Sequence, residues 1–325
     1  MIKYSFLEHY ILSNPEHFIY ECYPDDPRWQ LLPEAIIKEQ FLSQELLYHP
    51  WWKTGLRLTS EKERELLATD GKITMSLEGV NKSAYELILC CELKLLTSDI
   101  DLENDNRNIK FQNFMYLVRN GISWTCDIRL PVTGVYKVLF YAGKLNMPLL
   151  KICAFDIVCD VCNPDAIPLP VNTGIIGLGP GPAITPAGLS HPSHRNGIIH
   201  SHLEKTVNVK FRISSNINVR ANLVPFECEA QKQTNSDISM HSRCIVVTKR
   251  TYNEIMIVVL APEIHGQYLL EIVTENTAVR KQEDQIVCYY LLIYDITQSK
   301  DQEVCHNDIS NIYFMIYNCS RRNEW

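Results

Sequence analysis

The sequence predicts a mainly β protein, with two tandem antiparallel β-sandwiches preceded by a short α+β segment. Three observations predict this fold. The chain has 325 residues, which is more than one hydrophobic core usually serves. A set of landmark residues recurs once along the chain, and within each copy apolar residues alternate with polar ones at a period of two.

Composition places the chain among ordinary globular proteins, because hydrophobic residues make up 46% of it and charged residues 21%. The net charge of −7 gives no general attraction to nucleic acid or to an anionic membrane. Its apolar stretches fall short of the ~20 residues that a membrane span needs. Glu8 and His9 stand where a secretory signal has its apolar core. We therefore expect a cytoplasmic protein that binds neither nucleic acid nor membrane.

Residues 1–45 differ from the rest of the chain. Ser13 or Asn14 is placed to cap a short helix that has Pro15 at its first position. A second short helix is predicted over residues 33–47, with Glu34 in its first turn. The segment is typical of the edge of an α+β domain, and it is too short to bury a core by itself.

Residues 46–162 form the first predicted sandwich. Ile73, Met75 and Leu77 alternate with polar residues, as in a strand with one buried face. Short strands separated by polar turns indicate a sandwich of about seven strands. The further strands expected here span residues 85–95, 122–130, 135–142 and 151–159.

Residues 183–300 form the second predicted sandwich. Val207, Val209 and Phe211 alternate with polar residues in the same way. Residues 301–325 are predicted to be a terminal strand or tail. The further strands expected in this copy span residues 244–248, 255–260, 268–274 and 286–294.

The two copies share two features. The first is a single glycine, and the second is a later element that contains a proline, a glycine and a tyrosine. Gly55 and Gly188 are 133 residues apart (188 − 55), and Tyr136 and Tyr268 are 132 apart (268 − 136). Proline ends the preceding strand, and glycine permits a positive φ in the turn. The tyrosine ring then packs on the core while its hydroxyl reaches a loop carbonyl, as in a tyrosine corner. The eight landmarks are Gly55, Pro131, Gly134 and Tyr136 in the first copy and Gly188, Pro262, Gly266 and Tyr268 in the second.

Residues 163–182 are the predicted linker between the two sandwiches. Dense proline and glycine cannot sustain a helix or a strand ladder, so we expect a domain boundary that proteases cut. Proline stiffens this linker, and packing against the second sandwich is left open. The glycines Gly177, Gly179 and Gly181 do not make a phosphate-binding loop, because no Lys-Ser/Thr pair follows and the prolines remove backbone amides.

The 12 cysteines raise the question of disulfides or a zinc site. Cys159 and Cys162 form one Cys-x2-Cys pair, without a second pair at zinc-finger spacing. We expect the thiols to act as small buried hydrophobes at strand positions. Examples are Cys90, Cys126, Cys153 and Cys288.

A thiol nucleophile needs a nearby base and a third group that orients this base. Cys22, His17 and the Asp25-Asp26 pair are the local set of these types. Cys22 and His17 would lie on different faces of a helix, and no helix N-terminus activates the thiol. We therefore expect no catalytic residue in this chain.

Four histidines lie close together in the sequence, at His191, His194, His200 and His202. We interpret them as solvated side chains of loops and strand edges. The alternative is a zinc or copper site, because imidazole suits both metals. We expect no metal and no cofactor.

The string from His9 to Tyr20, followed by residues 24–32, resembles the kyphoscoliosis peptidase and hillarin family. It looks like the segment that closes the transglutaminase-like core in that family. Residues 52–60 and 130–142 look like its immunoglobulin-like module, which occurs in tandem in invertebrate members. The resemblance implies a cysteine, histidine and aspartate triad and a role at the cytoskeleton. In the family the triad precedes the stretch that matches residues 9–32, so none of its residues is expected here.

The expected function is that of a non-catalytic segment of a cytoskeleton-associated protein, which binds a protein partner rather than a small molecule. Exposed sheet edges would let a partner strand add to either sandwich. The alternative is the C-terminal part of a transglutaminase-like cysteine peptidase whose catalytic core lies upstream of this chain.

Overall fold

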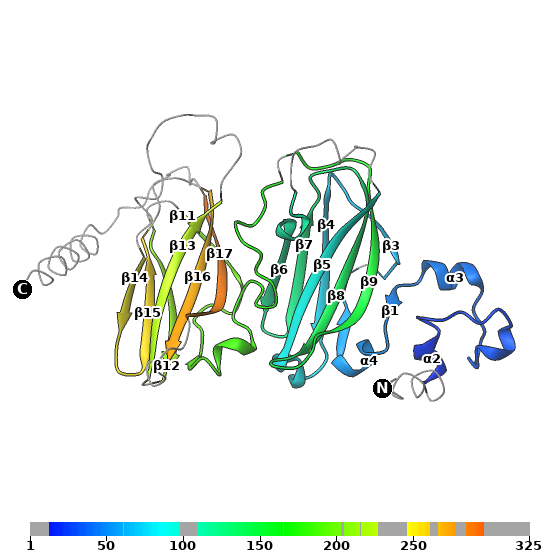
Figure 1. The fold of residues 1–325 in the computed structure, drawn as a ribbon, viewed down its shortest axis with the longest axis horizontal. Coiled ribbons are helices and arrows are strands. Elements are labelled where there is room, and N and C mark those ends of the chain that lie inside the picture. The colour runs from blue at the N-terminus through cyan, green and yellow to red at the C-terminus, as the bar shows by residue number, and fades with distance from the viewer. Residues whose placement is uncertain are drawn as a thin grey trace, which may run out of the picture. The chain divides into compact units, whose positions relative to one another are not determined.

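The structure is a computed structural model that describes residues 13–60, 62–97, 109–164, 166–202, 205–214, 216–226, 246–260, 266–276 and 284–295. All of these residues belong to one compact unit. Most of the ordered elements are strands, so the predicted mainly β fold is confirmed (Figure 1).

The first sandwich consists of two facing sheets. Its strands are β1 (Leu46–Leu47), β2 (Leu56–Leu58), β3 (Glu65–Leu67), β4 (Lys72–Gly79), β5 (Leu87–Thr97), β6 (Met115–Asn120), β7 (Ser123–Arg129), β8 (Gly134–Lys144) and β9 (Leu150–Cys159). One sheet has the order β2-β4-β7-β6. The other has the order β1-β9-β8-β5, and β3 pairs with β9 in parallel.

The second sandwich also consists of two facing sheets. Its strands are β10 (Leu189–Ser190), β11 (Ile198–His202), β12 (Val207–Ile213), β13 (Ile217–Pro225), β14 (Val246–Arg250), β15 (Glu254–Val259), β16 (Gly266–Asn276) and β17 (Gln285–Asp295). The sheet orders are β10-β12-β15-β14 and β11-β17-β16-β13.

The second sandwich repeats the strand order of the first. The sheet β10-β12-β15-β14 corresponds strand by strand to β2-β4-β7-β6. In the other sheet β11 pairs with β17 in parallel, as β3 does with β9, and β16 and β13 follow as β8 and β5 do. The landmark tyrosines lie near the start of the corresponding strands β8 and β16. The repeated residue pattern therefore corresponds to a repeated topology.

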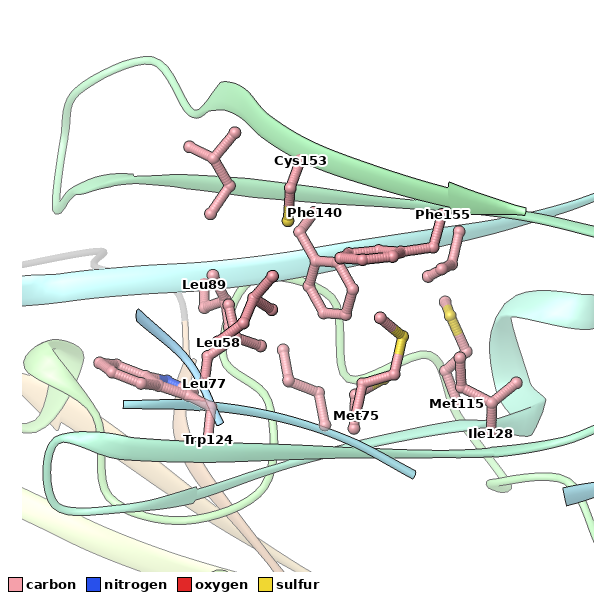
Figure 2. Packing of buried hydrophobic residues seen from close by; sticks show 14 of the residues in the cluster. Leu58, Met75, Leu77, Leu89, Met115, Trp124, Ile128, Phe140, Cys153 and Phe155 are labelled. Carbon is pink, nitrogen blue, oxygen red and sulfur yellow. The ribbon is translucent and has the colours of Figure 1, made fainter. Parts of the chain in front are cut away.

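Each sandwich encloses its own apolar core. In the first, alternate residues of β4 and β7 point inward, which is why Met75 and Trp124 are buried while their strand neighbours are less so. Figure 2 shows Met75 facing Phe140 and Phe155, which come from the other sheet, and Trp124 farther along the same inner face, near Leu77. The period-two alternation in the sequence thus marks the inner faces of the sheets.

Tyr136 forms the predicted tyrosine corner. Its side chain is 0% exposed, and its hydroxyl donates a hydrogen bond of 2.7 Å to the carbonyl of Val132. Gly134 has the expected positive φ, at 142°. Burial is the main reason why the pKa of Tyr136 lies well above its usual range.

The second copy shares part of this arrangement. Gly266 has a φ of 149°, and the buried Tyr268 packs edge-on against Tyr294 with ring centroids 5.9 Å apart. Pro262 lies outside the described residues. Of the remaining landmarks, Gly55 is the left-handed residue that ends α4 (Trp51–Thr54), and Gly188 comes directly before β10.

The N-terminal segment holds short helices. Asn14 caps α2 (Pro15–Phe18) as predicted, since its side chain accepts a hydrogen bond from the Glu16 amide. The second helix, α3 (Lys38–Ser43), is shorter than the sequence predicts. The reason is Gln30, whose buried side-chain amide binds both backbone groups of Ile36 and holds the chain before α3 in a turn. A single 3₁₀ turn, η1, spans Pro27–Trp29.

Nothing in the structure tests the assignment of residues 1–45 to a transglutaminase-like domain or the predicted domain boundaries, so these stay predictions. Among the described residues no helix combines the length and the apolar character that crossing a membrane requires.

Replacing Tyr136 by Phe should lower the free energy of unfolding by about 1–2 kcal/mol, because it leaves a buried carbonyl without its hydrogen bond. Urea denaturation measures this change. The matched control is Tyr141→Phe, which removes a hydroxyl that binds Glu92 at 3.0 Å on the outer face. The control should change stability by about 0.5 kcal/mol or less, and equal effects of the two substitutions would contradict the tyrosine corner.

Candidate functional site

Residues 177–179, which we call the junction strand, connect the two sandwiches by backbone hydrogen bonds. On one side Leu178 donates to the Leu117 carbonyl of β6 at 2.8 Å, and the Arg119 amide donates to the Leu178 carbonyl at 2.7 Å. On the other side the Gly179 amide donates to the carbonyl of Tyr289 in β17 at 2.7 Å. The junction strand therefore pairs with a strand of each sandwich.

Gly197 provides a second backbone connection. Its amide donates to the Arg119 carbonyl at 3.1 Å, and its carbonyl accepts from the Leu291 amide of β17 at 2.8 Å. The residue after it begins β11. Arg119 thus uses both of its backbone groups at the junction, one toward the linker and one toward the second sandwich.

Apolar side chains surround these hydrogen bonds in a third cluster, separate from the two cores, which we call the junction cluster. Its members come from β6, from the linker and from β16 and β17. The buried ones are Tyr116, Val118, Leu169, Leu178, Leu269, Tyr289 and Leu291. Because Leu169 and Leu178 are buried, the linker is a packed part of the structure. On this ground we predict slow cleavage by proteases there, in place of the ready cleavage predicted from proline and glycine content.

The glycines of the junction strand are needed for close backbone approach. A Cβ at Gly179 would lie 2.7 Å from the Arg119 carbonyl oxygen, and φ at this residue is 102°. A Cβ at Gly197 would lie 2.4 Å from the carbonyl of Leu178. The two backbones can therefore approach each other only because neither residue has a side chain.

Arg119 carries a buried positive charge at the same place. Its side chain donates to the carbonyls of Leu87 at 2.7 Å, Tyr85 at 2.8 Å and Gly121 at 2.9 Å. The guanidinium also lies 4.9 Å from the ring centre of Trp124. Burial lowers the pKa of Arg119 to about 10, so the group stays charged at neutral pH.

The partners of this guanidinium that the structure describes are backbone carbonyls and an aromatic ring. Arg119 therefore fixes the turn before β5 against the end of β6, which closes one side of the first sandwich. A small hollow beside it is lined by Ile88, Leu89, Leu117, Arg119, Trp124, Ile175, Ile176, Gly177 and Pro182. The linker thus covers the lateral opening between the sheets.

One sheet edge is also covered. The sequence predicts edges that are open to a partner strand, and β5 does end its sheet. At Leu93, however, the side-chain amide of Gln112 binds both backbone groups, donating to the carbonyl at 3.0 Å and accepting from the amide at 3.3 Å. A partner strand could not pair at this point without displacing Gln112.

The structure does not gather the residues that might form a thiol triad. His17 stacks on Trp52 with ring centroids 3.9 Å apart, and Asp26 binds Arg28. Burial and the nearby Glu21 raise the pKa of Cys22, which works against a reactive thiolate.

The histidines are not gathered into a metal site among the described residues either. His191 contacts Ser190, and His194 contacts Ser193. Burial lowers the pKa of His194, and its carbonyl accepts a hydrogen bond from the buried Tyr290 hydroxyl. These contacts suit loop residues that pack locally.

The sequence reasoning missed Arg119 and Leu178. One signal was present, because Met115 to Val118 and residues 286–294 are nearly continuous apolar runs. Such runs indicate strands that are buried on both faces. These runs could have predicted that the outer faces of β6 and β17 are covered by residues outside their own sandwich. They could not have predicted which residues cover them.

Comparison with known proteins assigns a class to the first sandwich. Residues 38–170 match the family model of the KY-like, immunoglobulin-like domain. The tyrosine corner and the two facing sheets agree with this assignment. The first sandwich is therefore an immunoglobulin-like domain of the KY type.

The chain as a whole resembles the kyphoscoliosis peptidase and hillarin family, as predicted. It is 24% identical to "Hillarin" of Drosophila melanogaster over 286 residues, which are 85% of this chain and 33% of that protein. It is 24% identical to human "Kyphoscoliosis peptidase" over 226 residues, 68% of this chain and 30% of that protein.

A third relative is "Lim and transglutaminase domain protein ltd-1" of Caenorhabditis elegans, 25% identical over 224 residues, 66% of this chain and 30% of that protein. The chain thus spans about a third of the length of the curated relatives it matches.

Replacing Arg119 by Met should lower the free energy of unfolding by about 2–4 kcal/mol, because the buried carbonyl of Leu87 and the partly buried carbonyls of Tyr85 and Gly121 lose their charged donor. The control is Arg57→Met, which removes an exposed ion pair with Glu78 and should cost about 1 kcal/mol or less. Guanidinium denaturation of both variants measures the difference. A similar loss of unfolding free energy in both variants would mean that the hydrogen bonds of the Arg119 guanidinium do not stabilise the fold.

Replacing Gly179 by Ala should make the linker sensitive to proteases, with cleavage about tenfold faster or more, because the new Cβ separates the junction strand from β6. The control is Gly174→Ala, which also has a positive φ, of 55°, but meets nothing within 4 Å. Limited proteolysis with mapping of the cut sites checks this. Rapid cutting of the unmodified chain within residues 163–182 would contradict the packed linker.

Proposed function

We propose that this chain is a non-catalytic structural and protein-interaction segment of a hillarin-like, cytoskeleton-associated protein. The observation that carries the proposal is the junction strand, which is hydrogen-bonded to a strand of each sandwich and lies within the junction cluster. An architectural segment needs domains that are held at a constant spacing. Backbone pairing and apolar burial at the junction hold the two sandwiches in this way.

The surface that we assign to a partner is the N-terminal segment. Four large apolar side chains there are exposed, with fractions of 72% for Trp29, 70% for Leu31, 58% for Ile37 and 52% for Leu42. Exposed apolar groups of this size are typical of contact surfaces, and tryptophan is a frequent anchor of protein interfaces. The cytoskeletal nature of the partner rests on analogy with the family that the chain resembles.

The second candidate is the C-terminal part of a transglutaminase-like cysteine peptidase whose Cys-His-Asp core lies upstream. The names of two relatives, a peptidase and a transglutaminase domain protein, favour it, and so does their greater length. In that case the exposed apolar residues of the N-terminal segment would contact the catalytic domain.

Co-sedimentation with actin filaments and with microtubules tests the first proposal. We expect the chain to pellet with one of the two, and Trp29→Ala to weaken binding about tenfold, because an interface anchor is lost. The control is Tyr252→Ala, which removes an aromatic side chain that is 96% exposed on the second sandwich. Failure to pellet with either filament, or equal losses in both variants, would argue against this function.

Peptidase and transglutaminase assays on the same chain separate the two candidates, and we expect both activities to stay at background. Cleavage or cross-linking that disappears in Cys22→Ser would make the chain itself an enzyme. A longer polypeptide that is active while this chain is inactive would support the second candidate.

A further inference from the structure

Two thiols face each other across the core of the first sandwich. Cys91 lies on β5, where it pairs with Phe140, and Cys126 lies on β7, where it pairs with Met75. These strands belong to opposite sheets, and the two Sγ atoms are 3.7 Å apart. The side chains therefore point toward one another from the two layers of the sandwich.

We propose that Cys91 and Cys126 form a modification site, in which an oxidant of the peroxide class joins them into a disulfide that links the two sheets of the first sandwich. The bond would need the sulfur atoms to approach each other by about 1.7 Å from their present contact, to the ~2.05 Å of a disulfide. Small rotations of both side chains, together with local opening of β5, which ends its sheet, would supply this movement.

This pair differs from the disulfide that many immunoglobulin domains share. There the second cysteine follows the corner tyrosine by two residues. The corresponding position in this chain is Val138, which is buried and carries no sulfur. The Cys91 and Cys126 pair connects a different pair of strands, so it does not restate the common pattern.

Packing alone does not require thiols at these positions. In the second sandwich the strand order and register place Ala221 and Ile257 at the corresponding sites, on β13 and β15. An apolar pair thus fills the same gap between sheets of the same topology. The contact between two cysteines is therefore specific to the first sandwich, and the packing of this fold does not require it.

The two cysteines differ in the exposure of the whole residue. Cys126 is 0% exposed, whereas Cys91 is half-buried and lies on β5, which ends its sheet. An oxidant therefore reaches Cys91 first, when the end strand opens locally. The contact with Cys126, together with burial, raises the pKa of Cys91, so the reaction is slow at neutral pH and accelerates as the pH rises.

The reaction balances in two steps. The Cys91 thiolate attacks hydrogen peroxide, which breaks the O–O bond and leaves a sulfenic acid and, after proton transfer, one water. The Cys126 thiol then attacks this sulfur, and the hydroxyl leaves as a second water. Two thiols are oxidised by two electrons, and one peroxide is reduced to two waters.

Oxidation should stabilise the first sandwich. The bond closes a loop of 35 residues (126 − 91), which restricts the unfolded chain. We expect the midpoint of thermal unfolding to rise by about 5 °C on oxidation and to return after reduction.

The test treats the full chain with hydrogen peroxide at pH 8.5, blocks the remaining thiols, and digests it with trypsin without a reductant. Mass spectrometry should find the peptide of Cys91 joined to the peptide of Cys126, lighter than their sum by two hydrogen atoms. Absence of this linked peptide under conditions that oxidise other thiols of the chain would overturn the proposal.

A neighbouring cysteine provides the matched control. Cys90→Ser should keep both the linked peptide and the thermal shift, whereas Cys91→Ser and Cys126→Ser should lose both. A link that persists in Cys91→Ser would assign the reaction to Cys90 and refute the proposed pair. Because Cys90 and Cys91 share one tryptic peptide, fragmentation of the linked peptide from the unmodified chain assigns the bond to one of the two sulfur atoms even if a variant does not fold.

Discussion

The backbone pairing of Leu178 is the contact on which the arrangement of the described chain depends. A strand that ends its sheet and is buried on both faces cannot leave its amides and carbonyls without partners. β6 is such a strand, and the junction strand supplies the missing hydrogen bonds at Leu117 and Arg119. The junction strand also pairs with β17. The segment that supplies the hydrogen bonds of β6 therefore connects the first sandwich to the second.

Arg119 shows how backbone carbonyls can hold a buried charge in place. Its side chain binds the carbonyls of Tyr85 and Leu87 at the start of β5 and that of Gly121 in the turn after β6, and its backbone groups bind the linker and Gly197. Carbonyl dipoles stabilise a guanidinium less than a carboxylate does, so burial still lowers its pKa. The residue also defines one geometry, since a guanidinium displaced from these carbonyls would leave both its N–H donors and the carbonyls without hydrogen-bond partners.

The two sandwiches share a topology but differ in chemistry. The first holds Arg119, the tyrosine corner and the facing thiols, and it matches the KY-like, immunoglobulin-like domain. The second contributes the apolar outer faces of β16 and β17 to the junction cluster. Two sandwiches of the same topology can therefore differ in their core and surface side chains. The topology depends on the alternation of residues and on the turns, whereas the chemical properties depend on single side chains.

The sequence by itself determined the two β-sandwiches, the start of α2 at Pro15 and the corner at Tyr136, because period-two alternation, a cap and a turn are local signals. Among the strands it missed are β6, whose run is continuous, and the three-residue β3, which is too short to show a period. It also missed β13, although Ile217 and Val219 alternate there with polar residues. Only the tertiary structure decided that the linker is packed and that Cys91 meets Cys126. Those contacts join residues far apart in the sequence, and their existence depends on how strands and sheets align, which no local pattern records.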